Sequence, residues 1–115
     1  MAVLQSLTKE NIIVSDLKIA KTFRDRGVGL LGQSSLPTGQ GLWIHHCNSI
    51  HTFFMKFTID CVFVNRSLKV VALNTAVRPW RLILPKWNAS SVFELPAGKI
   101  REMNIELGDQ LYVGN

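Results

Sequence analysis

Short apolar segments, each closed by turn-forming residues, constrain the fold of this 115-residue chain more than any other feature. One of these segments, 80–84, lies between Pro79 and Pro85. Because proline cannot donate to a β-ladder, it is predicted to be an irregular or edge strand. Closely spaced short strands predict a mainly β (α+β) fold, a compact single-domain β-barrel or sandwich-like sheet. The other segments with the length of strands are 12–20, 42–46, 52–57, 59–65, 68–73, 92–95 and 110–113.

Two short helices are expected beside the sheet. Thr22 begins a Ser/Thr-x-x-acid sequence that ends at Asp25, which is typical of a capped helix start. Glycines inside and after this segment weaken a helix, so it is predicted over about 22–31. A Pro-Ala-Gly turn introduces the second helix, predicted over 98–104.

Length and composition predict one globular domain over residues 1–115. A hydrophobic fraction of 47% with 18% charged residues argues against disorder. The N-terminus lacks the pattern of a secretory signal, and no apolar run reaches the ~20 residues that span a bilayer. We therefore expect a cytoplasmic protein without a membrane span, in which Cys47 and Cys61 are reduced and not bridged.

The net charge of +5 is concentrated in the middle of the chain. Residues 46–90 hold six Lys or Arg residues and Asp60 as the only acid. Such a region favours a small polar or anionic ligand, or an acidic protein partner. The alternative is an ordinary solvated surface, because no tight basic cluster is present. Nucleic acid is disfavoured, because stacking aromatics are not interleaved with the basic residues in the sequence.

Residues 41–64 hold all three histidines and both cysteines. Cys47 and His51 are candidates for a thiolate–imidazole pair, with Asn48 or Asp60 orienting the ring. A buried structural cysteine is the favoured reading, because no oxyanion stabiliser is recognisable. Paired Cys-x-x-Cys elements are also absent, and His45 and His46 would face opposite ways in a regular strand. No metal and no cofactor are therefore predicted.

Three charged residues stand within apolar segments: Lys56, Asp60 and Glu94. An unpaired charge in such a place is costly, so these side chains need partners, water or a ligand. One interpretation is a ligand-binding pocket at residues 43–60. The other gives them separate structural roles, with Asp60 capping a turn, Glu94 paired with Lys56, and Lys56 reaching out to solvent. The predicted pocket consists of Trp43, Asn48, His51, Lys56, Asp60 and Glu94, with Phe53 or Phe54 as a further wall.

Arg78 and Arg81 flank Pro79-Trp80 and suggest a second, basic and aromatic feature. Arginine can stack on the indole, and the pair can contact an anionic ligand or a base. The simpler interpretation is a surface loop anchored by a buried Trp80.

Several of these motifs together resemble the family known as domain of unknown function 192, over about residues 12–113. The chain departs from the family where Phe54 replaces a common Trp and an Asn-Thr pair is missing, and it resembles a branch carrying Cys-Asn-Ser-x-His at 47–51. The resemblance implies a compact, mostly β domain with two short helices and no established activity. The matching motifs are Gly29-Leu30-Leu31, Leu36-Pro37, Gly41-Leu42-Trp43-Ile44, Phe53-Phe54-Met55-Lys56, Phe57-Thr58-Ile59-Asp60, Glu94-Leu95-Pro96-Ala97-Gly98 and Gly108-Asp109.

The sequence favours a small accessory or ligand-binding domain with a polar-apolar pocket. A cysteine–histidine enzyme using Cys47 and His51 is the alternative. Weak binding of nucleic acid or anions through the basic middle region is the second alternative.

Overall fold

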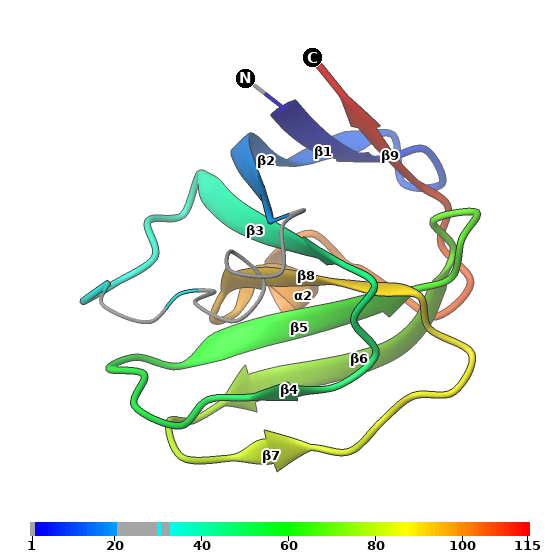
Figure 1. The fold of residues 1–115 in the computed structure, drawn as a ribbon. Helices are drawn as coiled ribbons and strands as arrows, with labels where there is room; N and C mark the ends of the chain where they lie inside the picture. The colour runs from blue at the N-terminus through cyan, green and yellow to red at the C-terminus, as the bar shows by residue number, and fades with distance from the viewer. Residues whose placement is uncertain (1, 21–29, 31–32) are drawn as a thin grey trace.

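The computed structural model describes residues 2–20, 30 and 33–115. Within them, seven strands form one curled sheet in the order β6-β5-β8-β3-β2-β1-β9, and β4 pairs with β7 in a separate ribbon (Figure 1). The described residues thus confirm the mainly β fold. The elements are β1 Ala2–Ser6, β2 Asn11–Ala20, β3 Gln40–His45, β4 Ile50–His51, β5 Ile59–Val64, β6 Val70–Val77, β7 Leu82–Ile83, β8 Ser91–Pro96, helix α2 Lys99–Glu102 and β9 Leu111–Gly114.

The inner strands β5, β8 and β3 lie side by side, and every residue of β5 and β8 is buried. Both faces of these strands are covered, which explains their continuous apolar sequences. One face carries a core around Val62 and Phe93, and the other carries a core around Phe63 and Val92. Neighbouring strands run antiparallel except β2 and β3, which are parallel.

The two ends of the sheet meet at one corner. Lys69, just before β6, forms an isolated antiparallel bridge with Gln110, just before β9. The amide of Leu111 also donates to the carbonyl of Leu68 at 2.9 Å. Because β6 and β9 are the outer strands of the sheet, this contact curls the sheet back on itself.

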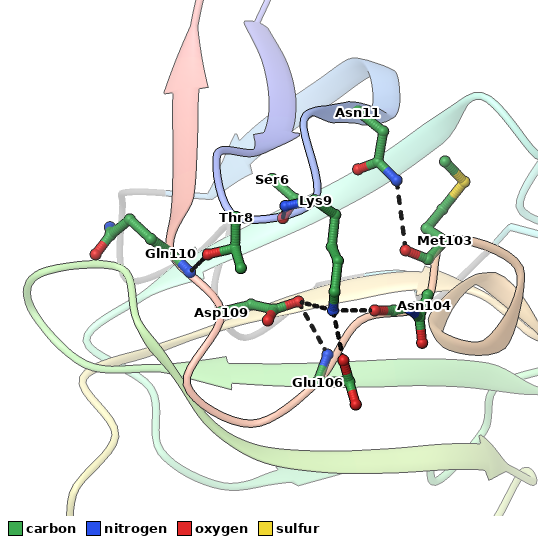
Figure 2. A network of polar contacts seen from close by, with 9 residues as sticks. All are labelled: Ser6, Thr8, Lys9, Asn11, Met103, Asn104, Glu106, Asp109 and Gln110. Atoms are coloured by element: carbon green, nitrogen blue, oxygen red, sulfur yellow. Dashed lines mark hydrogen bonds and ion pairs between the residues drawn. The ribbon is translucent and has the colours of Figure 1, made fainter.

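Lys9 fastens the turn between β1 and β2 to the segment that leads into β9 (Figure 2). Its Nζ atom lies 2.7 Å from Glu106 Oε1 and 2.9 Å from Asp109 Oδ2, and it donates to the carbonyl of Asn104 at 2.7 Å. All three donor positions of the ammonium group are thus used. The cluster therefore has a structural role, and its lysine has a partner for each donor.

The strand predicted at 52–57 is wrong. The chain makes a turn there, in which Met55 N donates to the carbonyl of Thr52 at 3.1 Å and Phe54 has a left-handed φ of 66°. Only Ile50–His51 of this region pairs as a strand, with β7. The first strand, Ala2–Ser6, was not predicted.

Other predicted elements agree with the structure to within a few residues. The strand predicted at 68–73 becomes β6, which continues to Val77, and the helix predicted at 98–104 is confirmed as α2. The helix predicted at 22–31 lies outside the described residues, apart from Leu30. No helix in the described ranges has the length and apolar character needed to cross a membrane.

Candidate functional site

A cavity of about 1020 Å³ opens where the ends of β3, β5 and the loop before β8 meet. This volume is at the upper end of the range of small-molecule sites. Three segments build it: the end of β3 with the following turn, the β5–β6 hairpin turn, and the loop entering β8. Its lining residues are Trp43, His45, His46, Cys47, Asn48, Asn65, Arg66, Ser67, Leu68, Trp87, Asn88, Ala89, Ser90 and Ser91.

Backbone hydrogen bonds fix the three segments relative to one another. The carbonyl of Ser90 accepts from Cys47 N at 3.1 Å, and Ser90 N donates to the carbonyl of Val64 at 2.8 Å. The loop before β8 is therefore held between the ends of β3 and β5. The side chain of Asn65 accepts from the amides of Ser67 and Lys69, each at 3.0 Å, and so fixes the hairpin turn. The walls of the cavity are preformed.

Trp43 is the most firmly oriented side chain of the cavity. Its Nε1 donates to Ser91 Oγ at 2.9 Å, and its ring stacks on Phe93 with centroids 5.2 Å apart. The ring of His45 lies 4.0 Å from it, tilted by 45°. The half-buried indole is thus held by Ser91, Phe93 and His45, and its orientation is fixed.

The two adjacent histidines both line the cavity. A regular strand would point His45 and His46 to opposite faces, but β3 ends at His45 and His46 has a left-handed φ of 52°. Their rings stand edge to face with centroids 6.3 Å apart. The left-handed backbone at His46 interrupts the strand alternation, and both imidazoles therefore line the cavity.

The cavity lining carries no carboxylate. Arg66 supplies a guanidinium, and Asn48, Arg66 and Asn88 make no side-chain hydrogen bond to another described residue. Trp87, at 86% exposure, adds a second indole at the rim. This combination suits a neutral polar or anionic molecule with a flat group.

Trp43 and Asn48 are the two predicted pocket residues that line this cavity; His51, Lys56, Asp60 and Glu94 lie elsewhere. Lys56 is exposed. The ring of His51 stacks on Phe53 with centroids 5.0 Å apart.

Asp60 and Glu94 point to opposite faces of the sheet. Glu94 pairs across the strands with Cys61, and Asp60 pairs with Leu95. Because side chains alternate along a strand, Glu94 shares its face with Cys61 and Asp60 does not. The register of β5 and β8 thus separates two carboxylates that adjacent strands bring close in space.

Asp60 has a structural role. Its Oδ1 accepts from Ala76 N and its Oδ2 accepts from Ile100 N, both at 2.9 Å. One carboxylate therefore joins β5 to a left-handed residue of β6, Ala76 with φ 50°, and to the first turn of α2. This observation supports the structural interpretation of Asp60.

Glu94 is buried without a hydrogen-bond partner for its Oε1 atom. Burial raises its pKa from 4.5 to about 7. Burial, followed by the charges of Glu94 and Asp60, also raises the pKa of the Cys61 thiol well above its usual value. On the next strand Asn74, which pairs with Cys61, has a buried and unpaired Oδ1. The three groups form a polar row across β8, β5 and β6.

Cys47 and His51 are engaged in separate contacts. The thiol of Cys47 donates to the carbonyl of Ser49 at 2.8 Å, and His51 Nδ1 accepts from Phe53 N at 3.3 Å. Cys47 and Cys61 are both free thiols. In the described part of the chain, no three His, Cys, Asp or Glu side chains gather closely enough to hold a metal ion.

The model of domain of unknown function 192 (DUF192), described as an uncharacterized ACR, matches residues 5–113. The chain belongs to this family. A UPF0127 protein of Thermococcus sibiricus is 38% identical over 112 residues, covering 90% of this chain and 70% of that protein. A UPF0127 protein of Thermococcus gammatolerans is 44% identical over 106 residues, covering 89% and 69%.

Solved structures support the same fold. A protein of unknown function from Novosphingobium aromaticivorans superimposes with a TM-score of 0.81 at 18% sequence identity, covering 96% of this chain and 82% of that one. At this identity the likeness concerns the fold alone. The function of this DUF192 member has to be argued from its own side chains.

Several cavity residues were not singled out from the sequence, chiefly Arg66, Trp87 and Ser91. Arg66 lies between the strands predicted at 59–65 and 68–73, but a connection between two strands does not show what it faces. Trp87 follows Pro85-Lys86 in a segment without regular periodicity, so no pattern placed it. Arg66, Trp87 and Ser91 come close to Trp43 only because the fold brings three distant segments together around the cavity.

Proposed function

We propose that this DUF192 domain binds a small planar molecule, neutral polar or anionic, in the cavity floored by Trp43. The observation that carries the proposal is a preformed cavity with an oriented indole and no carboxylate in its lining. A flat ring would pack against the two indoles that line the cavity, Trp43 and the exposed Trp87. Arg66 and Asn48, which also line it, would hold an anionic or polar substituent.

A calorimetric titration with three probes tests this proposal: adenosine monophosphate, adenosine and inorganic phosphate. The nucleotide combines a flat ring with an anion, and the other two probes each carry one of these parts. We expect the nucleotide to bind most tightly, because it satisfies both the indole surface and Arg66. Equal or absent binding of all three probes would contradict the proposal.

Variants assign the binding to the cavity. Arg66→Gln should weaken nucleotide binding about tenfold or more, because a hydrogen-bonded charge pair is lost, and should leave adenosine binding unchanged. Trp43→Phe keeps a ring but removes the donor to Ser91, and should weaken both ligands. Arg101→Gln, an exposed arginine on α2, is the matched control. Binding that Arg101→Gln reduces as much as Arg66→Gln does would be nonspecific charge attraction.

A further inference from the structure

The ribbon of β4 and β7 exposes apolar side chains on its outer face. We call Phe53, Phe54, Trp80, Leu82 and Leu84 the ribbon patch. Phe54 is 69% exposed, Trp80 57%, Leu82 60% and Leu84 67%. Large contiguous apolar surfaces of this kind mark interaction sites on folded proteins.

The two faces of the ribbon differ. Ile50 pairs with Ile83, and both pack against the core, whereas His51 pairs with Leu82 on the opposite face. Phe53 follows in the turn after β4, and its ring stacks on that of His51 with centroids 5.0 Å apart, which places it on the outer face. Ile50 and Ile83 on the inner face hold the ribbon to the core, and the side chains on the outer face are exposed to a partner.

Thr52 locks together the two turns that carry the aromatic residues. It is completely buried, and its N donates to the carbonyl of Arg81 at 2.9 Å, while its Oγ1 accepts from Arg81 N at 2.8 Å. Its carbonyl accepts from Trp80 N at 3.0 Å, and its Oγ1 donates to the carbonyl of Arg78 at 2.6 Å. The hydrogen bonds of one buried threonine therefore fix the positions of the two turns that carry the patch.

The aromatic residues at the two turns are presented at a conformational cost. Phe54 and Trp80 each have a φ of 66°, a left-handed backbone that bulky side chains rarely adopt. Their rings meet with centroids 4.7 Å apart, and Phe53 stacks on Trp80 at 6.0 Å. These two left-handed residues differ from exposed Ala76 in carrying large aromatic rings, and we read their exposure together with the leucines as the sign of a surface function.

The exposed charged residues that flank the ribbon patch along the described chain are cations. Lys56, Arg78 and Arg81 are exposed next to it, and none of them enters an ion pair with a described residue. Between residues 61 and 93 the sequence contains no Asp or Glu, and Asp60 is turned inward to two backbone amides. Charge complementarity therefore requires an anionic occupant.

We propose that the ribbon patch docks this domain on a membrane surface of anionic phospholipids. Trp, Phe and Leu side chains projecting from short turns can enter the interfacial region without a complementary pocket. The flanking cations then lie at the depth of the phosphate groups. A single-stranded nucleic acid would use the aromatic rings but not Leu82 and Leu84, which cannot stack on bases.

Vesicle flotation tests the docking. The probes are vesicles of phosphatidylcholine alone and of phosphatidylcholine mixed with phosphatidylglycerol. We expect the protein to float with the mixed vesicles and to remain in solution with the neutral ones. Arg81→Gln should weaken binding about fivefold, the effect expected of one cation at an anionic surface. The double variant Phe54→Asn with Trp80→Asn should abolish it; asparagine tolerates the left-handed backbone, so the turns should persist.

Matched controls stand far from the patch. Leu107 is 66% exposed near β9, and Leu107→Ser removes a comparable apolar side chain. Arg101→Gln removes an exposed charge on α2. Both should bind vesicles as the parent does, and circular dichroism should show that all variants keep the sheet.

Vesicle binding that is equal for neutral lipids, or insensitive to the patch variants, would overturn the proposal. Retention of a single-stranded oligonucleotide without vesicle binding would overturn it as well. Failure of the cavity ligands to bind would leave this result unaffected, because the patch and the cavity share no residue.

Discussion

At the scale of single residues, the buried Glu94 makes stability depend on pH. Its pKa is 4.5 in an ordinary setting and about 7 in the fold, so the native state binds more protons between these values. The contribution of Glu94 to the free energy of unfolding is therefore fully present below about pH 4.5, and it is lost as the pH rises through 7. Since one pKa unit corresponds to about 1.4 kcal/mol, the loss amounts to about 3 kcal/mol at pH 8.

The variant Glu94→Gln should abolish this dependence, because the amide stays neutral. Relative to the parent, we expect it to be nearly neutral at pH 4.5 and more stable by up to about 3 kcal/mol at pH 8. Urea denaturation at the two pH values measures the difference. The other carboxylates titrate equally in both proteins and cancel. An equal stability difference at both pH values would show that Glu94 is solvated in the folded state.

The sequence identifies Glu94, Asp60 and Lys56 as unusual because charges are rare in apolar strands. It does not reveal that two of them face opposite ways. That depends on the register in which Glu94 meets Cys61, and long-range register is set by the packing of strands about thirty residues apart in the chain. The sequence thus predicts which charged residues need partners, but it does not predict which of them lie on the same face of the sheet.

At the scale of elements, Asp60 joins β5, β6 and α2 through two backbone amides. Asp60→Ala should lower the free energy of unfolding by about 3 kcal/mol, because two backbone donors, of which that of Ile100 is buried, lose a charged acceptor. Asp60→Asn should cost less, since its amide oxygen can still accept one bond. Urea denaturation compares both with Asp16→Ala, a half-buried carboxylate on β2, expected within about 0.5 kcal/mol of the parent. Equal effects of the three changes would contradict the bridging role.

Strands with strong local patterns were predicted well. In the ribbon, the edge strand predicted at 80–84 agrees with β7, but the strand predicted at 52–57 does not form and β4 was missed. Residues 59–65 and 92–95 are mostly apolar, with one carboxylate each, and both are strands in the structure. Residues 52–57 are equally apolar but form a turn, because buried Thr52 bonds to a loop almost thirty residues later. Tertiary hydrogen bonds override local propensity there. The same contact joins the aromatic and basic residues that are separated in the sequence.

At the scale of the whole molecule, the curl of the sheet creates both surfaces that we assign to binding. It brings the β5–β6 turn and the loop before β8 to Trp43, and it leaves the β4–β7 ribbon outside the sheet (Figure 1). Composition predicted a basic middle region without showing what it surrounds. The fold divides these cations between Arg66 at the cavity and Arg78 and Arg81 at the ribbon patch. One polar ligand site and one docking surface can therefore act independently.

Closure of the sheet through β9 should make unfolding a single cooperative event. Leu111 is 1% exposed at the corner where β9 meets the segment before β6, and its amide bonds to the carbonyl of Leu68. Leu111→Ala should lower the free energy of unfolding by about 2–5 kcal/mol, the range for truncating a buried leucine. Tyr112→Ala, at a neighbouring half-exposed position, is the control and should have a much smaller effect.

Tryptophan fluorescence reports mainly on the cavity and the ribbon, whereas far-ultraviolet circular dichroism reports on the whole sheet. If the corner contact couples the sheet, Leu111→Ala moves both transitions to the same lower urea concentration. Separate transitions in the variant would show that the two ends of the sheet unfold independently, and that the corner contact between them is incidental.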